Sequence, residues 1–364
     1  MKVVLLHDWL TGFRGGERVL EVFCEMFPDA PLYTLVYQKG TTSPVIENRK
    51  IKASFLNRFP GIDKHYRKFL PLFPLAASTL KIEEDCDLVL SSSHCVIKGV
   101  KKPKGSKHLS YIHSPMRYIY DQFENYFGKE APFVQRLGAL CCRPYLQAWD
   151  RASNKNVDQM IANSSFVQKR IKDFYSCDSK VIHPFVDLKD FREVQNHPHE
   201  KSDFYLMVTA FAPNKRVSLA IEAFNELGIP LKIVGGGQQE CELKEMSKDN
   251  IFFLGNVSRE EVVTLMNKAR GFIFPGVEDF GITPLESLAA GTPIVARKIG
   301  GVLETLNDDV AQFFIEDHKD ALIEAVRLFE KRSFDRAKLL QRAEDFSKET
   351  FKKKIEEEIR NLFS

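Results

Sequence analysis

The sequence predicts an α/β protein with two Rossmann-like domains, each built on a parallel sheet covered by helices on both faces. Three observations support this prediction. The chain has 364 residues, which at about 150 residues per domain favours two domains. Hydrophobic residues make up 44% and charged residues 28%, which is a globular composition and excludes a disordered or fibrous chain. Short apolar runs alternate with amphipathic stretches, and this alternation begins again in the second half.

The first half contains six short apolar runs with the character of buried strands. They lie at residues 3–7, 32–36, 87–91, 109–113, 160–163 and 181–183. Amphipathic stretches between them predict helices at residues 17–26, 132–150 and 164–175. Unbroken apolar strands separated by helices are typical of a parallel sheet that is buried on both faces.

The second half repeats this pattern. Strands are predicted at residues 204–208, 231–234, 251–254, 271–274, 294–296 and 312–315. Helices are predicted at residues 217–227, 240–248, 260–269 and 285–290. The polar stretch 187–203 has no apolar period, so we expect it to be the linker. The predicted domains are residues 1–190 and 191–346, with a C-terminal helix at 347–364 completing the first.

Basic residues are concentrated in the first third of the chain, although the net charge is only +3. Residues 51–81 hold six basic residues and one acidic residue, and residues 98–117 hold six basic residues and no acidic one. Such blocks attract phosphate groups on a nucleotide, a lipid or a diphosphate substrate, or they form an ordinary solvated face. A nucleic-acid partner is not expected, because the basic residues lack interleaved stacking aromatics.

The distribution of cysteines and the length of the apolar runs predict the cellular compartment of the protein. The seven cysteines are scattered without a C-x-x-C pair, as in proteins of a reducing compartment. The first apolar run is too short for a signal peptide, and no run reaches the ~18 residues that cross a bilayer. We therefore expect a cytoplasmic protein. The cations and large apolar side chains of residues 64–75 suit either the surface of an anionic membrane or an ordinary helix.

The segment 274–291 carries the strongest functional signal. A strand ends near Phe274, and Thr283 and Pro284 form a good N-cap and first-turn pair for the helix that follows. Ligands of doubly wound sheets bind at such strand-to-helix junctions. Glu278 and Glu286 are eight positions apart, so both carboxylates can face one ligand. The simpler interpretation is a solvated loop acid and a helix acid that stabilises the first turn.

Three other positions follow predicted strands. Gly15 and Gly16 follow the first strand and permit a close approach of the backbone to a bound group, or simply form a tight turn. His113 lies at the end of a predicted strand. A single histidine at such a position either has a structural role in the fold or faces a bound ligand. Lys215 and Arg216 lie before a helix, where cations can meet a diphosphate. The acids of Asp85-Cys86-Asp87 introduce a buried strand, so we do not expect them to bind metal.

Together these motifs resemble those of retaining glycosyltransferases of family 4, which have the GT-B fold. The resemblance rests on the E-x7-E string from Glu278 to Glu286, on residues 233–237 and 253–257, on Asn163-Ser164-Ser165, and on residues 113–121. The last of these, His-Ser-Pro-Met-Arg-Tyr-Ile-Tyr-Asp, is most similar to the branch of bacterial polysaccharide and O-antigen mannosyltransferases.

The resemblance implies roles for individual residues. It assigns catalysis to His113, Glu278 and Lys215, and acceptor binding to Arg14, Arg117 and Tyr118. Donor binding falls to Gly15, Gly16, Lys215, Arg216, Gly235, Val257, Glu278, Asp279, Phe280, Gly281, Ile282, Thr283 and Glu286. Many relatives carry an arginine five residues before the lysine, where this chain has Ala210, and Arg216 or Arg14 could compensate.

The implied activity is transfer of a hexose with retention of configuration. The resemblance implies mannose from GDP-mannose as donor and a lipid-linked or growing surface-polysaccharide glycan as acceptor, with polyprenyl diphosphate as the lipid. No metal or other cofactor is implied, and the protein could lie peripherally on the inner face of the cell membrane. Alternatives are a UDP-hexose donor, an inactive homologue that still binds sugar nucleotides, and a glycosidase using Glu278 and Glu286.

Overall fold

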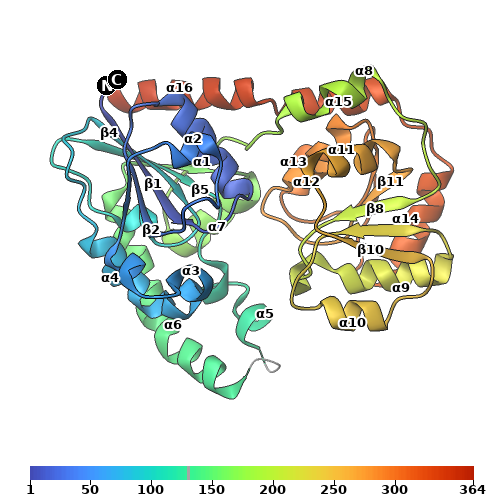
Figure 1. Ribbon diagram of the computed structural model, residues 1–364, viewed down its shortest axis with the longest axis horizontal. Helices are drawn as coiled ribbons and strands as arrows, with labels where there is room; N and C mark the ends of the chain where they lie inside the picture. The colour runs from blue at the N-terminus through green and yellow to red at the C-terminus, as the bar shows by residue number, and fades with distance from the viewer. Residues whose placement is uncertain (129–131) are drawn as a thin grey trace. The chain divides into compact units, whose positions relative to one another are not determined.

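A computed structural model describes residues 1–128 and 132–364, which form two compact units (Figure 1). The first unit comprises Met1–His183 and Lys352–Ser364, and the second comprises Pro184–Phe351. Each unit has its own sheet and its own hydrophobic core. Within the described residues, no helix combines the length and the apolar character needed to span a membrane.

The first unit is built on a seven-stranded parallel sheet in the order β3-β2-β1-β4-β5-β6-β7. The inner strands β1 and β4 are buried along nearly their whole length, as expected for a sheet covered on both faces. The strands are β1 Val3–Leu10, β2 Leu32–Tyr37, β3 Ile51–Ala53, β4 Leu88–Ser93, β5 Lys107–Ile112, β6 Gln159–Ala162 and β7 Lys180–Val181.

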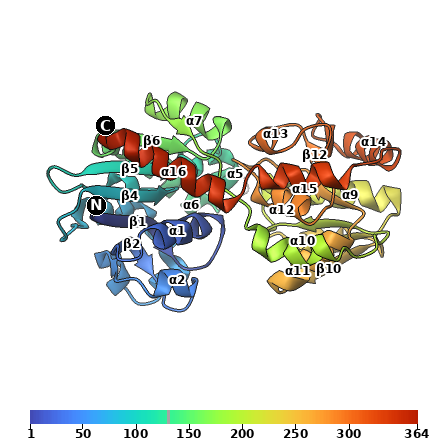
Figure 2. The same cartoon turned by 90° about the horizontal axis from the view of Figure 1, so that it is seen from above.

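Helices cover both faces of this sheet (Figures 1 and 2). They are α1 Gly15–Met26, α2 Pro44–Glu47, α3 Ile62–His65, α4 Phe73–Thr79, α5 Phe123–Phe127, α6 Phe133–Ser153, α7 Ser165–Tyr175 and α16 Lys348–Phe363. The C-terminal part of α16 joins the first unit through ion pairs: Lys352 contacts Glu25 of α1 at 2.8 Å, and Glu358 contacts Lys180 of β7 at 2.7 Å.

The second unit is built on a six-stranded parallel sheet in the order β10-β9-β8-β11-β12-β13. Its strands are β8 Tyr205–Val208, β9 Leu231–Val234, β10 Ile251–Gly255, β11 Gly271–Phe274, β12 Ile294–Arg297 and β13 Ala311–Phe314. Its helices are α8 Arg192–Asn196, α9 Val217–Leu227, α10 Glu240–Glu245, α11 Arg259–Lys268, α12 Ile282–Ala289, α13 Val302–Thr305, α14 Lys319–Glu330 and α15 Arg336–Glu344. Helices α9 and α14 pack on one face, and α11, α12 and α15 pack on the other.

These sheets confirm the predicted fold class. Every predicted strand is present, with ends shifted by three residues at most. The additional strand β3 escaped prediction because it is a three-residue edge strand with only half-buried side chains. The expected linker 187–203 is partly helical. It contains α8, and Phe191 and Val194 are buried in the second core, since two well-spaced apolar residues suffice to anchor a short helix.

Candidate functional site

In the first unit, polar side chains gather where the parallel strands β1, β4 and β5 end. His7 and Asp8 lie near the end of β1, Ser92 lies in β4, and His113 directly follows β5. The side chains of His7 and Asp8 are completely buried. Because parallel strands end at the same edge, residues far apart in the sequence meet here.

Asp8 organises the loop that follows β4. Its two carboxylate oxygens accept four hydrogen bonds of 2.7–2.9 Å from the backbone N–H groups of His94, Cys95, Val96 and Ile97. Four charge-assisted bonds satisfy a carboxylate that burial would otherwise make costly. The backbone after β4 is therefore held in one conformation beside His113.

His113 is connected to Glu17 by a series of hydrogen-bonding side chains. Its Nε2 is 2.7 Å from Ser92 Oγ, which is 3.1 Å from Nδ1 of His7. His7 Nε2 is in turn 3.6 Å from Glu17 Oε1. We call these four residues, Glu17, His7, Ser92 and His113, the histidine–serine chain. Burial alone would raise the pKa of Glu17, but its hydrogen bond and electrostatic interaction with His7 outweigh burial and lower that pKa to about 2.

The start of α1 lies against the histidine–serine chain. A Cβ atom on Gly16 would be 3.6 Å from Cε1 of His7 and 3.7 Å from Nε2 of His113, so the helix backbone contacts both rings. Glu17 Oε2 also accepts a 2.9 Å hydrogen bond from the backbone N–H of Arg14. The structure thus brings Gly16 and His113 together, with Gly15 as the first residue of the helix.

The surroundings of His113 keep its ring uncharged. Burial lowers the pKa of His113 well below its usual value, and the electrostatic interactions with the neighbouring His94 and His7 lower it further. Its backbone carbonyl accepts a 2.9 Å hydrogen bond from Asn163 Nδ2, which places the matched Asn-Ser-Ser motif directly behind the histidine. Of the predicted acceptor residues, Arg117 Nε donates to Ser114 Oγ at 3.3 Å, and the hydroxyl of Tyr118 lies 2.8 Å from Cys95 Sγ.

In the second unit, the loops that follow β8 and β11 pack backbone against backbone. The N–H of Val277 donates to the carbonyl of Asn214 at 3.0 Å. A Cβ atom on Gly276 would come within 2.7 Å of that carbonyl and 2.8 Å of Lys215 Cα, so only glycine fits this approach. The contact brings Lys215 and Glu278 together as an ion pair, with about a fifth of each side chain exposed.

The remaining predicted cation of this loop is already engaged. Arg216 Nε lies 2.8 Å from Asp317 Oδ1, and Arg297 lies 3.0 Å from the other oxygen of that carboxylate. Ala210 is exposed after β8. Arg216 is thus held toward Asp317, which argues against its replacing the arginine that Ala210 lacks.

Glu286 has a partner that the sequence did not reveal. Arg259, the first residue of α11, contacts Glu286 Oε1 through its terminal nitrogen at 2.8 Å and Asp190 through Nε at 2.8 Å. Its guanidinium also lies over the ring of Phe191, 5.2 Å from the centroid. Only the presence of an arginine next to Ser258 could have suggested this contact, and that signal is weak.

The helix that carries Glu286 begins earlier than predicted. Gly281 is its N-cap, with φ of +90°, and α12 begins at Ile282, so the prediction of a Thr283 cap is wrong. Glycine adopts the left-handed backbone conformation readily, so the chain can enter the helix at this N-cap, two residues before the predicted one. Asp279 and Phe280 are buried, and the Phe280 ring packs 5.8 Å from Phe346. Only the backbone of Phe280 is therefore placed to bind a ligand.

The other predicted donor residues follow β9 and β10. Gly235 has φ of +127° and donates its N–H to the carbonyl of Gly255 at 2.8 Å, which joins these two loops. Val257 is half-buried against the core. The loops after β8, β9, β10 and β11, together with the start of α12, thus carry the predicted donor residues of the second unit at the carboxyl edge of its sheet.

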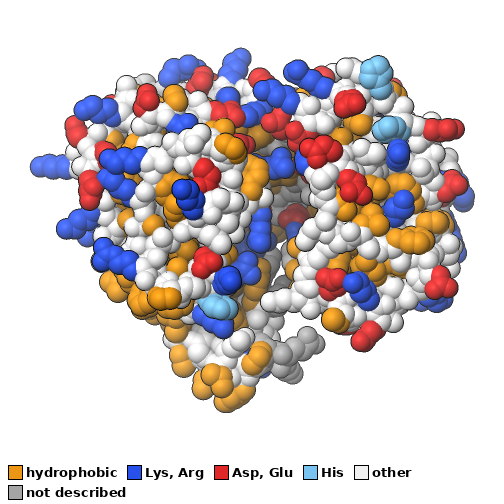
Figure 3. Space-filling model, in the orientation of Figure 1, with side chains coloured by type: hydrophobic (Ala, Val, Ile, Leu, Met, Phe, Trp, Pro, Cys, Tyr) orange, Lys and Arg blue, Asp and Glu red, His pale blue; other side chains and the backbone are white. Residues whose placement is uncertain are grey.

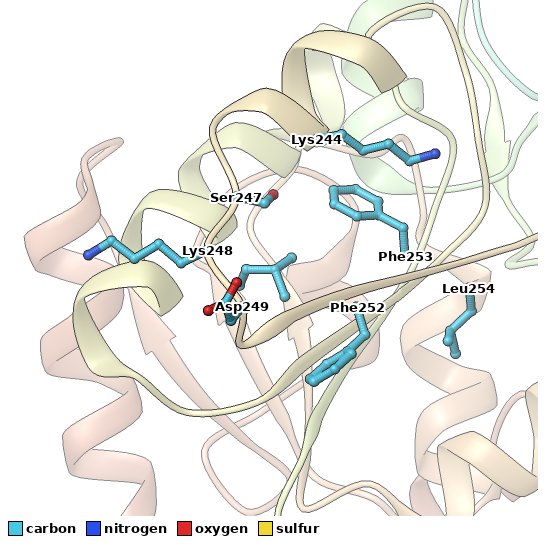
Figure 4. Close-up of a pocket in the computed structure, with 8 residues that line it drawn as sticks. Lys244, Ser247, Lys248, Asp249, Phe252, Phe253 and Leu254 are labelled. Atoms are coloured by element: carbon cyan, nitrogen blue, oxygen red, sulfur yellow. The ribbon is translucent and has the colours of Figure 1, made fainter.

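A surface pocket in the second unit contains none of these residues. It lies along the edge strand β10 and the end of α10 (Figure 4). Its lining consists of Lys244, Ser247, Lys248, Asp249, Ile251, Phe252, Phe253 and Leu254. In the described part of the chain, no three His, Cys, Asp or Glu residues are grouped as metal ligands. Asp87 instead accepts a 2.7 Å hydrogen bond from the backbone N–H of Lys2.

Comparison with known proteins identifies the second unit. Residues 189–350 match the family model of glycosyl transferases group 1. The solved sucrose-phosphate synthase of Thermosynechococcus elongatus has the same fold, with a TM-score of 0.74 over 100% of this chain and 99% of that one, at 17% identity. The second unit is therefore a group 1 glycosyltransferase domain, and the chain has the GT-B fold of two Rossmann-like units. Both findings confirm the predicted resemblance.

Curated relatives include mannosyltransferases. O-antigen chain mannosyltransferase C of Escherichia coli is 31% identical over 133 residues, which are 34% of this chain and 36% of that protein. Human alpha-1,3/1,6-mannosyltransferase ALG2 is 26% identical over 297 residues, which are 72% of this chain and 68% of that protein. The alignments with the first relatives span about half of their length or less.

Proposed function

We propose that this protein is a retaining glycosyltransferase that takes a hexose from a nucleotide sugar, with mannose from GDP-mannose as the first candidate. The observation that carries the proposal is the pairing of Lys215 with Glu278 by two adjoining loops, within a group 1 glycosyltransferase domain. The mannosyltransferase relatives support the choice of sugar. A UDP-hexose remains the alternative donor.

In this proposal, the second unit binds the donor. Lys215 and the backbone N–H groups at the start of α12 meet the diphosphate, where they stabilise the charge that develops as the sugar leaves. Glu278 accepts hydrogen bonds from sugar hydroxyls, and Glu286 accepts them from the ribose. Arg259 fixes the orientation of Glu286.

The first unit supplies the groups around the acceptor and the transferred sugar. His113 hydrogen-bonds a sugar hydroxyl, and the N–H groups of Gly15 and Gly16 contribute to pyrophosphate binding at the start of α1. Arg14, Arg117 and Tyr118 contact the acceptor. The acceptor hydroxyl attacks the face from which the diphosphate departs and passes its proton to the departing phosphate, which retains the configuration of the sugar.

Turnover of nucleotide sugars tests the proposal. Purified protein is incubated with GDP-mannose, UDP-glucose and UDP-galactose, and release of the nucleoside diphosphate is measured. Glu278→Gln should lower kcat/KM about 10- to 150-fold, since a lost charge-assisted hydrogen bond costs about 1.5–3 kcal/mol. The exposed Glu245→Gln in α10 is the matched control and should leave turnover unchanged.

Three outcomes separate the alternatives. Binding of a sugar nucleotide without release of diphosphate would identify an inactive homologue. Hydrolysis of a nitrophenyl glycoside with no nucleotide requirement would identify a glycosidase. Binding of none of the nucleotides would overturn the donor assignment altogether.

We further propose a lipid-linked acceptor and peripheral contact with an anionic membrane. Helix α6 carries a stripe of exposed apolar side chains, of which Phe133 and Val134 are 77% and 80% exposed and Leu137 is 50% exposed. No acidic residue occurs between residues 132 and 149. Figure 3 shows apolar side chains along the margin of the first unit where α3, α4 and α6 lie. Exposed Arg67 and Lys68 precede α4 and suit anionic headgroups.

Liposome cosedimentation tests this contact. Phe133→Ser/Leu137→Ser should reduce binding to anionic vesicles, because each serine removes apolar area that would enter the bilayer interface. The matched control is Ile315→Ser/Leu328→Ser, which changes two apolar residues of the second unit that are 72% and 41% exposed. Equal binding of both double variants and the unchanged protein would contradict the assignment of α6.

A further inference from the structure

The histidine–serine chain ends on His113. In the proposed function, His113 is the residue of the first unit that contacts the transferred sugar directly. We propose that Glu17, His7 and Ser92 are positioning residues that hold the proton of His113 on Nε2 and leave Nδ1 as a hydrogen-bond acceptor for a substrate hydroxyl. This inference rests on the proposed function for its consequence, but the position of the proton is a property of the free protein.

The argument begins at Glu17. An ionised carboxylate can only accept hydrogen bonds, and the His7 atom that faces it, at 3.6 Å, is Nε2. The His7 side chain is fully buried, and Nε2 has no closer hydrogen-bond partner in the described part of the chain. A proton on Nε2 is stabilised by the carboxylate, whereas a bare lone pair would face its negative charge. When His7 carries a single proton, that proton is therefore on Nε2.

Ser92 passes this choice to His113. With Nε2 protonated, Nδ1 of His7 is an acceptor, and the hydroxyl of Ser92 donates to it across 3.1 Å. A hydroxyl has one proton, so toward His113 the same oxygen must accept. The 2.7 Å contact is then a hydrogen bond from His113 Nε2–H to Ser92 Oγ.

The other ring nitrogen of His113 follows from this. The ring is neutral, because burial and the neighbouring histidines lower its pKa well below the usual value. A neutral imidazole protonated on Nε2 has a lone pair on Nδ1. His113 is half-buried, and within residues 1–128 and 132–364 only its Nε2 is hydrogen-bonded to another side chain. Nδ1 can therefore accept a hydrogen bond from a hydroxyl of the substrate.

The reverse arrangement is chemically distinct. If His7 carried protons on both nitrogens, its Nδ1 would donate to Ser92, and the Ser92 hydroxyl could then donate to His113 Nε2. His113 would then carry its proton on Nδ1 and could offer a substrate only a donor. The titratable groups that face His113 from the surrounding elements are His7, Glu17, His94 and Arg117. The two arrangements differ in the number of protons on His7.

Nitrogen NMR of ¹⁵N-histidine-labelled protein distinguishes the two arrangements. The His113 signals are identified by their loss in His113→Asn, and the proton-bearing nitrogen is recognised from its one-bond coupling to hydrogen. We expect the proton on Nε2 in the free protein near neutral pH. In Ser92→Ala, this preference should weaken and a second form with the proton on Nδ1 should appear.

Ser91→Ala is a closely matched control. Ser91 is the neighbouring buried serine of β4, and its hydroxyl contacts Nε2 of another buried histidine, His108, at 2.9 Å and Ser110 Oγ at 2.7 Å. Because alternate residues of a strand face opposite sides, its loss removes similar hydrogen bonds without touching His113. Ser91→Ala should leave the His113 signals unchanged. It also shows how much thermal stability the loss of one buried serine hydroxyl costs.

Activity provides an independent readout. With the best donor, Ser92→Ala should lower kcat about tenfold with little change in KM, since the hydrogen bond that His113 accepts from the substrate hydroxyl matters most as the sugar loosens. A proton found on Nδ1 of His113 in the free protein would overturn the inference whatever the activity. A proton on Nε2 without any donor turnover would uphold the arrangement of the chain and count against the proposed function.

Discussion

The buried carboxylate of Asp8 gives a direct test of how the first-unit site is held together. We predict that Asp8→Asn strongly destabilises the first unit. Asparagine has the same shape as aspartate, so the change leaves no cavity. It replaces one of the two accepting oxygens by an NH₂ group, which cannot accept the two hydrogen bonds that the lost oxygen accepted from backbone N–H groups.

The magnitude follows from the four hydrogen bonds of 2.7–2.9 Å. Each carboxylate oxygen accepts two of them, so Asp8→Asn leaves two buried backbone N–H groups facing another donor. An unsatisfied buried donor costs about 1–3 kcal/mol, which gives a total of about 2–6 kcal/mol. This loss is about half of the free energy of unfolding of an ordinary domain.

Urea unfolding followed by circular dichroism measures the loss. Because each unit has its own hydrophobic core, the transition of the first unit should move to lower urea while that of the second stays in place. The control is Asp85→Asn, since the Asp85 side chain is 91% exposed and makes a long ion pair of 3.8 Å with Lys2 Nζ. A loss below about 1 kcal/mol in Asp8→Asn would refute the proposed role of the four hydrogen bonds.

Two further predictions concern a buried histidine and a loop glycine. Burial lowers the pKa of His108 to about 4, so the folded protein keeps it neutral while the unfolded chain binds a proton below about pH 6.5. Stability should therefore fall as the pH is lowered, and His108 should contribute about 2 kcal/mol of this loss between pH 7 and pH 5. In pH-dependent urea unfolding, His108→Gln should remove this contribution, whereas the exposed His65→Gln should not. Gly276→Ala should lower stability by about 1–3 kcal/mol in the same assay, and it should weaken donor binding by displacing Lys215. The control is Gly236→Ala, whose new Cβ meets nothing closer than 3.5 Å. Equal stability of the two variants would contradict the close packing of the two loops.

Much of the fold could be predicted because parallel α/β sheets have a strong local signature. Buried strands such as β8 and β11 are continuous apolar runs, and the helices between the strands keep a clear period. The signature fails where an element is short or anchored by few residues. Strand β3 has three half-buried residues, and α8 depends on the burial of Phe191 and Val194, which tertiary packing decides.

The candidate site was predictable only in part, for a different physical reason. Residues that belong to a recognisable string, such as Glu278 and Glu286, could be singled out. Their partners could not, because the topology of the sheet alone brings Arg259 to Glu286, or Ser92 to His113. Polar residues inside apolar strands were the available signal: His7 and Asp8 interrupt the buried run of β1, and buried polar groups require partners.

The paired charges of the second unit bear on how a donor would bind. Lys215 and Glu278 neutralise each other in the free protein, so neither charge is left without a partner in a site that is mostly buried. A diphosphate that draws Lys215 away frees the Glu278 carboxylate, and the sugar hydroxyls next to that diphosphate can take the place of the lysine. The ion pair therefore favours ligands that carry a phosphate and a hydroxyl-rich group together. Inorganic pyrophosphate alone would satisfy only the lysine and leave the glutamate unpaired.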